Sequence, residues 1–230
     1  MRRPTPFPPR PPRARLPPSP TRSPPMLTLY TNPQSRGRIA RWMLEETGEP
    51  YEARIVDYGS AMKGPDYTAI NPMGKVPALV HDGAVVTEVM AICGYLAQAF
   101  PQAGLLPDDR AGFWRWMAFA AGPLEYAIVN RSFGWEPAPE HRGRIGYGDY
   151  DTVVRVLADH LRGRTYAVGD RFSAVDVVLG AQVGFGLRFG TLPSDPALAA
   201  YWEGISDRPA ARRANETDDR LLAERKAANA

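Results

Sequence analysis

The stretch that decides the fold covers residues 71–79 and reads Asn-Pro-Met-Gly-Lys-Val-Pro-Ala-Leu. A proline seldom occupies the second position of an inner strand, because it cannot donate to the ladder. Pro77 therefore fits if the Val76–Pro77 peptide bond is cis, which would bend the chain and expose the backbone N–H and C=O of Val76 to a ligand. The alternative interpretation of this stretch is an ordinary edge strand.

The sequence around this stretch, from Met26 to Phe100, alternates short apolar runs with segments of helical period. This alternation indicates an α/β unit with a parallel pair of strands in its sheet. The Asp82-Gly83 pair predicts a hairpin turn between the last two strands. The expected strands are 27–30, 51–56, 76–80 and 84–87, and the expected helices are 35–47, a short one before Asn71, and one that places Val89, Ile92, Cys93 and Leu96 on one face.

Strand alternation is missing beyond a turn-rich connector at residues 101–108. Helical spacing predicts that the remainder is all-α, with Pro123 interrupting the first helix. The expected helices cover residues 109–130, a segment around 153–161, 172–189, 196–206 and a last one from Pro209. The chain is thus predicted to consist of an α/β part followed by an all-α part.

The net charge of +3 is unevenly distributed. Residues 1–25 are rich in proline and hold six arginines and no acid, so removing them leaves a charge of −3 for residues 26–230. We expect this segment to be disordered and functionally inert, with Met26 as a candidate start of the native protein. A basic surface for nucleic acid is therefore not expected on the body. No apolar run approaches the roughly 20 residues that span a membrane.

The only cysteine is Cys93, so the chain can form no internal disulfide and no CxxC redox pair. We interpret Cys93 as a small core side chain because it lies on the apolar face of its helix. His81, His141 and His160 lack metal-ligand spacing, and no metal is expected. A reducing compartment is the default location.

A second informative stretch, residues 30–38, reads Tyr-Thr-Asn-Pro-Gln-Ser-Arg-Gly-Arg. It predicts a strand end, a turn and a helix start. A hydroxyl at a helix N-terminus, here Ser35, can donate a hydrogen bond to an anion such as a thiolate, or it can act only as an N-cap. A third stretch begins a helix at Glu88, whose carboxylate can accept from an ammonium group or complement the helix dipole.

Four motifs occur in order: Tyr-x-x-Pro-x-Ser from Tyr30, the stretch at 71–79, Glu-x-x-Ala-Ile from Glu88, and a capping box formed by Ser173 and Asp176. Together they resemble the glutathione S-transferase family over essentially all of residues 26–230. The resemblance implies a cytosolic-type bacterial member with a thioredoxin-like domain at 26–101 and an all-helical, substrate-binding domain at 109–230. Ser173 and Asp176 would then serve folding, and Pro77 the shape of the binding loop.

Carried over to this sequence, the resemblance implies a role for each of five residues. Ser35 would stabilise the glutathione thiolate, and Val76 would pair its backbone with the cysteinyl part. Glu88 would hold the γ-glutamyl ammonium. Lys75 would lie near the glycyl end, and Lys63 would bind the glycyl carboxylate.

Two departures from the family pattern qualify this assignment. Many classes have Glu-Ser at the third motif, whereas this chain has Glu88-Val89, so only the backbone N–H of Val89 remains for the γ-glutamyl carboxylate. The Tyr30 motif followed by Arg-Gly-Arg also resembles the tyrosine-type classes, with two extra residues before Arg36. Ser35 is therefore the predicted thiolate stabiliser, and Tyr30 is the runner-up.

The resemblance implies a cytoplasmic, homodimeric glutathione transferase of detoxification, with glutathione as co-substrate and a hydrophobic electrophile as second substrate. Peroxidase, isomerase or dehalogenase side activity is compatible with the same chemistry. The alternative is a non-catalytic module that keeps the scaffold and binds glutathione or another protein. An aromatic group on the first helix of the second half contains both core and pocket candidates: Phe113, Trp114, Trp116, Met117 and Phe119.

Overall fold

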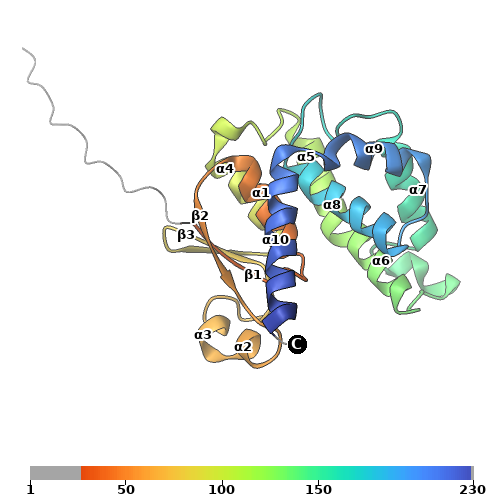
Figure 1. Cartoon of the computed structure of the whole chain (residues 1–230). Helices are drawn as coiled ribbons and strands as arrows, with labels where there is room; N and C mark the ends of the chain where they lie inside the picture. Colours follow the sequence, from red (N-terminus) through yellow and green to blue (C-terminus); the bar gives the residue numbers. More distant parts are fainter. Residues whose placement is uncertain (1–26, 229–230) are drawn as a thin grey trace, which may run out of the picture.

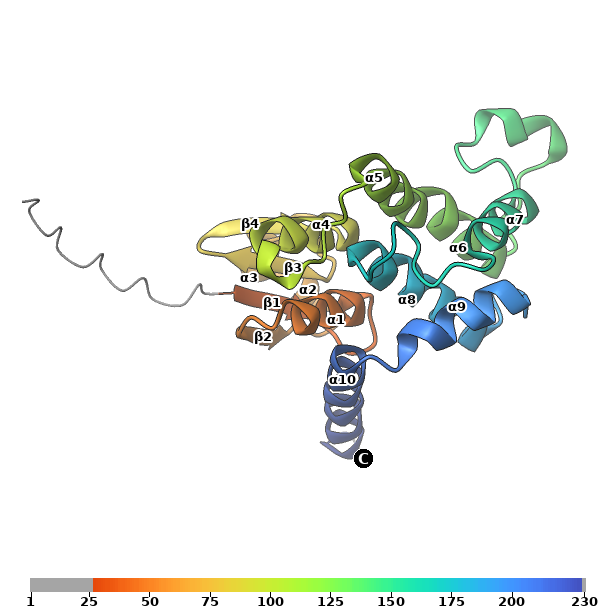
Figure 2. The same ribbon diagram turned by 90° about the horizontal axis from the view of Figure 1, so that it is seen from above.

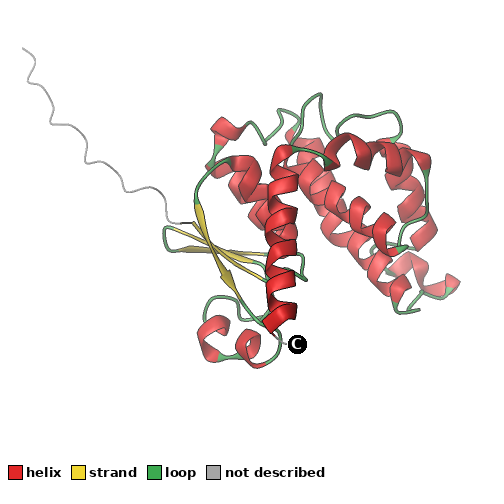
Figure 3. Cartoon of the chain, in the orientation of Figure 1, coloured by secondary structure: helices red, strands yellow, loops and turns green. Residues whose placement is uncertain are grey.

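A computed structural model describes residues 27–228 of the 230-residue chain. The predictions about residues 1–25 and Met26 lie outside the described residues. The strands gather in one half of the molecule, and the other half consists of helices alone (Figure 3). This arrangement confirms the predicted thioredoxin-like α/β part followed by an all-helical part.

The sheet of the first half has the strand order β2-β1-β3-β4. β1 pairs with β2 in parallel and with β3 antiparallel, and β3 pairs with β4 antiparallel. The parallel pair and the hairpin were both predicted, and the turn residues Asp82 and Gly83 have φ values of 49° and 86°. The strands are β1 (Leu27–Thr31), β2 (Tyr51–Ile55), β3 (Ala78–His81) and β4 (Ala84–Thr87).

β3 begins two residues later than its predicted start at Val76. Pro77 has no N–H to donate, and the Val76–Pro77 bond is cis as predicted. The helix predicted to begin at Ser35 likewise begins at Gly37. The helices of this half are α1 (Gly37–Thr47), α2 (Ser60–Lys63), α3 (Pro65–Thr68) and α4 (Val89–Ala99).

The two faces of the sheet carry different clusters. Leu27 and Leu29 of β1 are buried with residues of α1 and α4 in the main core. The opposite face carries a small cluster in which Tyr30 packs beside Tyr67 and Ala78. Because successive side chains of a strand point to opposite faces of the sheet, Tyr30 points away from the face that packs against α1, and the burial of β1 alternates accordingly.

The second half begins with a broken helix, as the position of Pro123 predicted. A π-helical turn at Ala120–Leu124 contains this proline and separates α5 (Arg110–Phe119) from α6 (Glu125–Ser132). Three single-piece helices follow: α7 (Tyr150–Leu161), α8 (Ala174–Phe189) and α9 (Pro196–Ser206). Short 3₁₀ helices lie at Pro101–Ala103 and Pro139–Arg144.

The last helix, α10 (Pro209–Ala228), returns to the first half. It runs across the sheet-containing part in Figure 1 and lies beside α1 in Figure 2. Arg41 of α1 donates from Nε to Asp218 of α10 at 3.0 Å, with both side chains buried. The two halves are therefore joined a second time, far along the chain from the connector.

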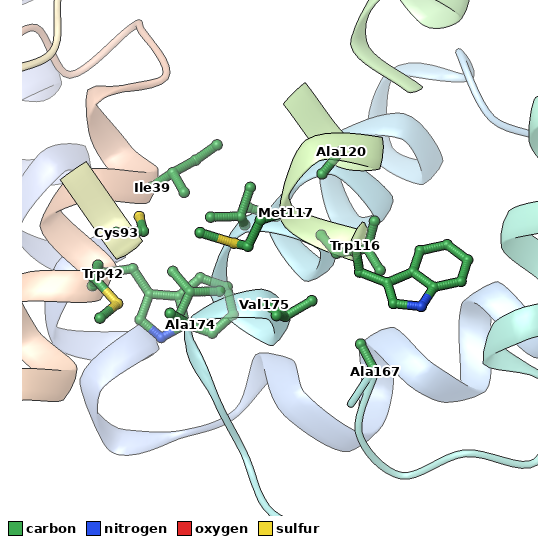
Figure 4. Close-up of a cluster of buried hydrophobic side chains, with 14 of the residues drawn as sticks. Ile39, Trp42, Cys93, Trp116, Met117, Ala120, Ala167, Ala174 and Val175 are labelled. Carbon is green, nitrogen blue, oxygen red and sulfur yellow. The ribbon is translucent and has the colours of Figure 1, made fainter. Parts of the chain in front are cut away.

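The two halves share one apolar core. In the close-up, Trp42 and Cys93 of the first half face Met117 and Val175 of the second (Figure 4). The Trp42 ring lies 6.1 Å from that of Phe172. This continuous packing fixes the position of the helical half against the sheet-containing half.

Candidate functional site

A cleft of about 730 Å³ lies between the two halves. The first half contributes loop residues and the region around α2, and the second half contributes one face each of α6 and α8. Leu222 of α10 also lines the cleft. The lining includes Ser35, Arg36, Lys63, Lys75, Val76, Gln182, Phe185, Arg188 and Phe189.

Ser35 lies half-buried in the cleft, just before α1. Its Oγ donates to the carbonyl of Asn32 at 2.7 Å and accepts from the backbone N–H of Gly37 at 2.9 Å. The hydroxyl therefore satisfies the N–H of Gly37, the first residue of α1, while the N-cap position itself is occupied by Arg36. The same position lets Oγ face an anion near the positive end of the helix.

Gly37 makes this position of Ser35 possible. A Cβ at residue 37 would overlap the Thr31 hydroxyl and approach the Ser35 Oγ to 2.9 Å. The turn is held further by Asn32, whose side chain accepts from the N–H of Gln34 and donates to the Val56 carbonyl. Ser35 thus sits in a turn fixed by its neighbours.

The runner-up, Tyr30, is not among the residues that line the cleft. Its hydroxyl accepts from Arg54 at 3.3 Å, and its ring lies 5.9 Å from the ring of Tyr67. Tyr30 belongs to the small cluster on the other face of the sheet. The structure therefore brings Ser35, but not Tyr30, to the cleft.

Two lysines line the cleft on the side of the first half. Lys63 Nζ donates to the carbonyls of Met73 and Gly74, at 3.1 and 2.8 Å. Lys75 is exposed and has no ion-pair partner in the described part of the chain. Each ammonium can donate to a carboxylate at this end of the cleft.

The backbone of Val76 is available to a ligand. Val76 lines the cleft beside the cis peptide bond, and within residues 27–228 its N–H and C=O make no hydrogen bond. The neighbouring loop is closed by the Lys75 carbonyl, which accepts from Tyr67 and Asn71. Backbone N–H and C=O groups left free in this way can pair with a peptide-like ligand.

Glu88 and Val89 do not line the cleft. Glu88 is exposed and precedes α4 with φ 70° and ψ 125°, a conformation that costs a non-glycine residue about 1–3 kcal/mol. Strain of this kind concentrates at ligand sites. Val89 is the first residue of α4, so its N–H is an orphan donor.

Sequence reasoning missed the part of the cleft that the second half contributes, and the contact that joins it to Arg36. Arg36 forms an ion pair with Glu125 of α6, and Gln182 of α8 donates to the same carboxylate at 2.7 Å. Phe185 and Phe189 follow on α8, with ring centroids 6.4 Å apart. The spacing 182, 185, 189 marks one face of a helix and could have indicated a common surface, but not that it faces a cleft.

The remaining candidates are buried. Cys93 is inaccessible, and burial raises the pKa of its thiol, which agrees with the core interpretation. Ser173 and Asp176 form the predicted capping box: the Ser173 hydroxyl accepts from the N–H of Val175, and Asp176 accepts from the N–H of Ser173 at 2.9 Å. Asp176 also accepts from Tyr201 and from the N–H of Ala167, which ties α8 to its surroundings. Burial raises the pKa of Asp176 despite these bonds.

Residues 27–228 contain no group of three or more His, Cys, Asp or Glu side chains placed to hold a metal ion. None of the helices in this part of the chain has the length and apolar character needed to cross a membrane.

The sequence also matches those of known proteins. Residues 35–99 match the family profile described as glutathione S-transferase, N-terminal domain. A glutathione S-transferase of Xanthomonas campestris, GST-4.5, is 32% identical over 163 residues, which cover 66% of this chain and 79% of the relative. Glutathione S-transferase 3 of Zea mays is 31% identical over 207 residues, covering 80% and 90%.

Solved structures agree with the sequence matches. A sphingomonad glutathione S-transferase complexed with glutathione superposes with a TM-score of 0.68 and 29% identity, covering 84% of this chain and 98% of the other. The similarity therefore extends over both halves.

Proposed function

The chain belongs to the glutathione S-transferase family, and from this premise we propose that it is a serine-type glutathione transferase in which Ser35 stabilises the glutathione thiolate. The observation that carries the proposal is the cleft itself. It gathers Ser35, Lys63, Lys75 and the unpaired backbone of Val76 along one wall. Tyr30 does not line the cleft.

The role of Ser35 follows from its hydrogen bonds. Its hydroxyl donates to a neutral carbonyl in the ligand-free protein, and turning toward a thiolate would exchange that bond for a stronger, charge-assisted one. A donor that favours the anion lowers the thiol pKa from its ordinary value near 8.5. More of the reactive thiolate is then present at neutral pH, where it attacks an electrophilic carbon.

The remaining residues match the charges of glutathione, which has two carboxylates and one ammonium. We propose that Lys63 and Lys75 hold the glycyl carboxylate and that the Val76 backbone pairs with the cysteinyl unit. Glu88 would accept from the γ-glutamyl ammonium, while the backbone N–H of Val89 donates to the neighbouring carboxylate. The strained backbone of Glu88 supports a ligand role, although Glu88 lies outside the cleft lining.

The variants Ser35→Ala and Tyr30→Phe test the assignment. With 1-chloro-2,4-dinitrobenzene as electrophile, we expect Ser35→Ala to lower kcat/KM by about 10²-fold, as for loss of one donor to a developing anion. The pKa of bound glutathione, followed by ultraviolet absorbance of the thiolate, should rise in the same variant. Tyr30→Phe should behave as wild type. The reverse pattern would assign the thiolate to Tyr30.

The non-catalytic alternative is separated by binding and turnover. Calorimetry should detect glutathione binding, and conjugation should follow with a broad panel of electrophiles. Binding without turnover on the whole panel would favour the non-catalytic module. Absence of binding would contradict both functions.

Three finer properties are proposed from family membership: a hydrophobic electrophile, a homodimer, and a cytoplasmic role in detoxification. The aromatic wall formed by Phe185 and Phe189 supports the first. Sedimentation of the protein at micromolar concentration should give the mass of a dimer, and a monomer there would contradict the second.

A further inference from the structure

The wall of the cleft opposite Ser35 is built by the C-terminal part of α8. Phe185, Arg188 and Phe189 line it together with Ile128 and Val129 of α6. Phe189 is 69% exposed, and the guanidinium of Arg188 lies 5.7 Å from the centre of its ring. This wall therefore combines flat apolar surface with one cation.

Arg188 differs from three other cations of the cleft in its partners. Arg36 is neutralised by Glu125, Arg38 donates to Asp219 at 2.5 Å, and Lys63 donates to two carbonyls. Arg188 has no hydrogen-bond or ion-pair partner in the described part of the chain. Its charge is free to meet a ligand.

The surroundings of Arg188 favour an anion. Among the described residues that line the cleft, none is an aspartate or a glutamate. A guanidinium offers a planar fork of donors that matches a carboxylate. Lys75, the other unpaired cation, lies on the glutathione side, beside Val76.

We propose that Arg188 binds an anionic group, such as a carboxylate, on the electrophile, so that the enzyme selects aromatic electrophiles carrying a negative charge. The aromatic part would lie against Phe185 and Phe189, and the anion would receive the guanidinium fork. This inference rests on the proposed transferase function and adds the substrate class to it.

Two chlorinated probes test the inference. The neutral probe is 1-chloro-2,4-dinitrobenzene and the anionic probe is 4-chloro-3,5-dinitrobenzoate; in both, the glutathione sulfur bonds to the ring carbon and chloride leaves. Each kcat/KM is divided by the uncatalysed rate constant of the same probe. We expect Arg188→Gln to lower the anionic-to-neutral ratio about three- to fivefold, the size expected for an exposed ion pair.

Further variants sharpen the test. Arg188→Glu should lower the ratio more than Arg188→Gln, Arg188→Lys should restore part of it, and 0.5 M NaCl should reduce the wild-type ratio by screening. Arg155→Gln, an exposed arginine outside the cleft, should leave the ratio unchanged.

Two outcomes would overturn the inference without touching the transferase function. One is an unchanged ratio in Arg188→Gln while wild type conjugates the neutral probe. The other is a raised KM for glutathione with the ratio unchanged, which would assign Arg188 to glutathione. Absence of conjugation with either probe in wild type would instead contradict the proposed function.

Discussion

The candidate site requires a glycine at position 37. Its Cα lies so close to Thr31 and Ser35 that no Cβ can be added without moving one of them. The turn that presents the Ser35 hydroxyl therefore depends on a residue without a side chain.

Gly37→Ala should move the Ser35 turn. We expect a loss of about 1–3 kcal/mol in the free energy of unfolding, typical of overpacking, together with a lower kcat/KM. Urea denaturation and the chlorodinitrobenzene assay measure the two effects. Gly204→Ala is the matched control, because a Cβ there meets open space in α9 and should stabilise slightly. Equal behaviour of the two variants would contradict the role of Gly37.

At the same scale, sequence reasoning found residues whose role depends on local pattern. Ser35, Val76 and the cis bond at Pro77 follow from short motifs, and the structure confirms the cis bond. The strain at Glu88 and the partners of Arg36 could not be predicted. The strain at Glu88 depends on how β4 joins α4. The pairing of Arg36 with Glu125 joins residues that are 89 positions apart.

At the scale of elements, α5 and α7 meet through an aromatic stack. His160 of α7 lies face to face with Trp116 of α5, with ring centroids 3.6 Å apart and planes inclined by 19°. Its Nε2 lies 2.8 Å from the carbonyl of Ala167, so this nitrogen carries the proton. Burial lowers the pKa of His160, the hydrogen bond to Ala167 opposes this effect, and the charges of Arg164 and Arg115 add to it.

This lowered pKa predicts a loss of stability in mild acid. As pH falls, the unfolded chain binds a proton at His160 near pH 6.5, before the folded chain does. The stabilisation that comes from keeping His160 neutral in the folded protein is therefore fully present above about pH 6.5. It is lost as the pH falls through that value toward the lower pKa of His160 in the folded state. Urea denaturation at pH 7.5 and pH 5.5 gives the free energy of unfolding at each pH. The difference between the two values should be smaller in His160→Gln than in wild type. His141→Gln, which removes an exposed histidine, is the control, and an equal pH effect in all three proteins would contradict the prediction.

The contact of α1 with α10 depends on a buried charge pair. One nitrogen of Arg41 and one oxygen of Asp218 have no hydrogen-bond partner, so each charge depends strongly on the other. Burial raises the pKa of Asp218, and Arg41 offsets part of that effect. Removing one partner leaves the other charge buried and uncompensated.

Asp218→Ala should therefore lower the free energy of unfolding by about 3–5 kcal/mol. Asp219→Ala, which removes a 65% exposed carboxylate one residue away, should cost less than about 1 kcal/mol. Urea denaturation compares the two variants. A small effect in Asp218→Ala would mean that water reaches the pair.

Most element boundaries were predictable because they carry local signals. Pro196 and Pro209 begin α9 and α10 at the predicted positions, and Pro123 lies in the break between α5 and α6. The return of α10 to α1 was not predictable. Periodicity indicates that a segment is helical and which side is apolar, but not which distant helix it meets.

At the scale of the whole molecule, the two halves share their stabilising contacts. Arg208 forms a two-pronged pair with Glu46 at 2.7 and 2.8 Å, and its guanidinium lies 3.7 Å from the centre of the Phe172 ring. The ring of Trp42 contacts those of Phe172 and Trp202. The described residues of the two proposed domains, 26–101 and 109–230, thus contribute to a common core.

We therefore expect a single cooperative unfolding transition. Calorimetry of the whole chain should give equal calorimetric and van't Hoff enthalpies for one peak. A chain ending at residue 108 should lack stable tertiary structure, since the apolar face of α1 and α4 would be exposed. Two resolved transitions, or a folded fragment, would contradict this expectation.

The return of α10 also has a consequence for the order of events during synthesis. Asp218 follows Arg41 by 177 positions, so a ribosome translates nearly the whole chain before the partner of Arg41 exists. Until then the nascent first half carries the unpaired guanidinium of Arg41 at a position that is buried in the folded protein. We infer that this half completes its folding late in translation and stays a candidate for chaperone binding until α10 arrives.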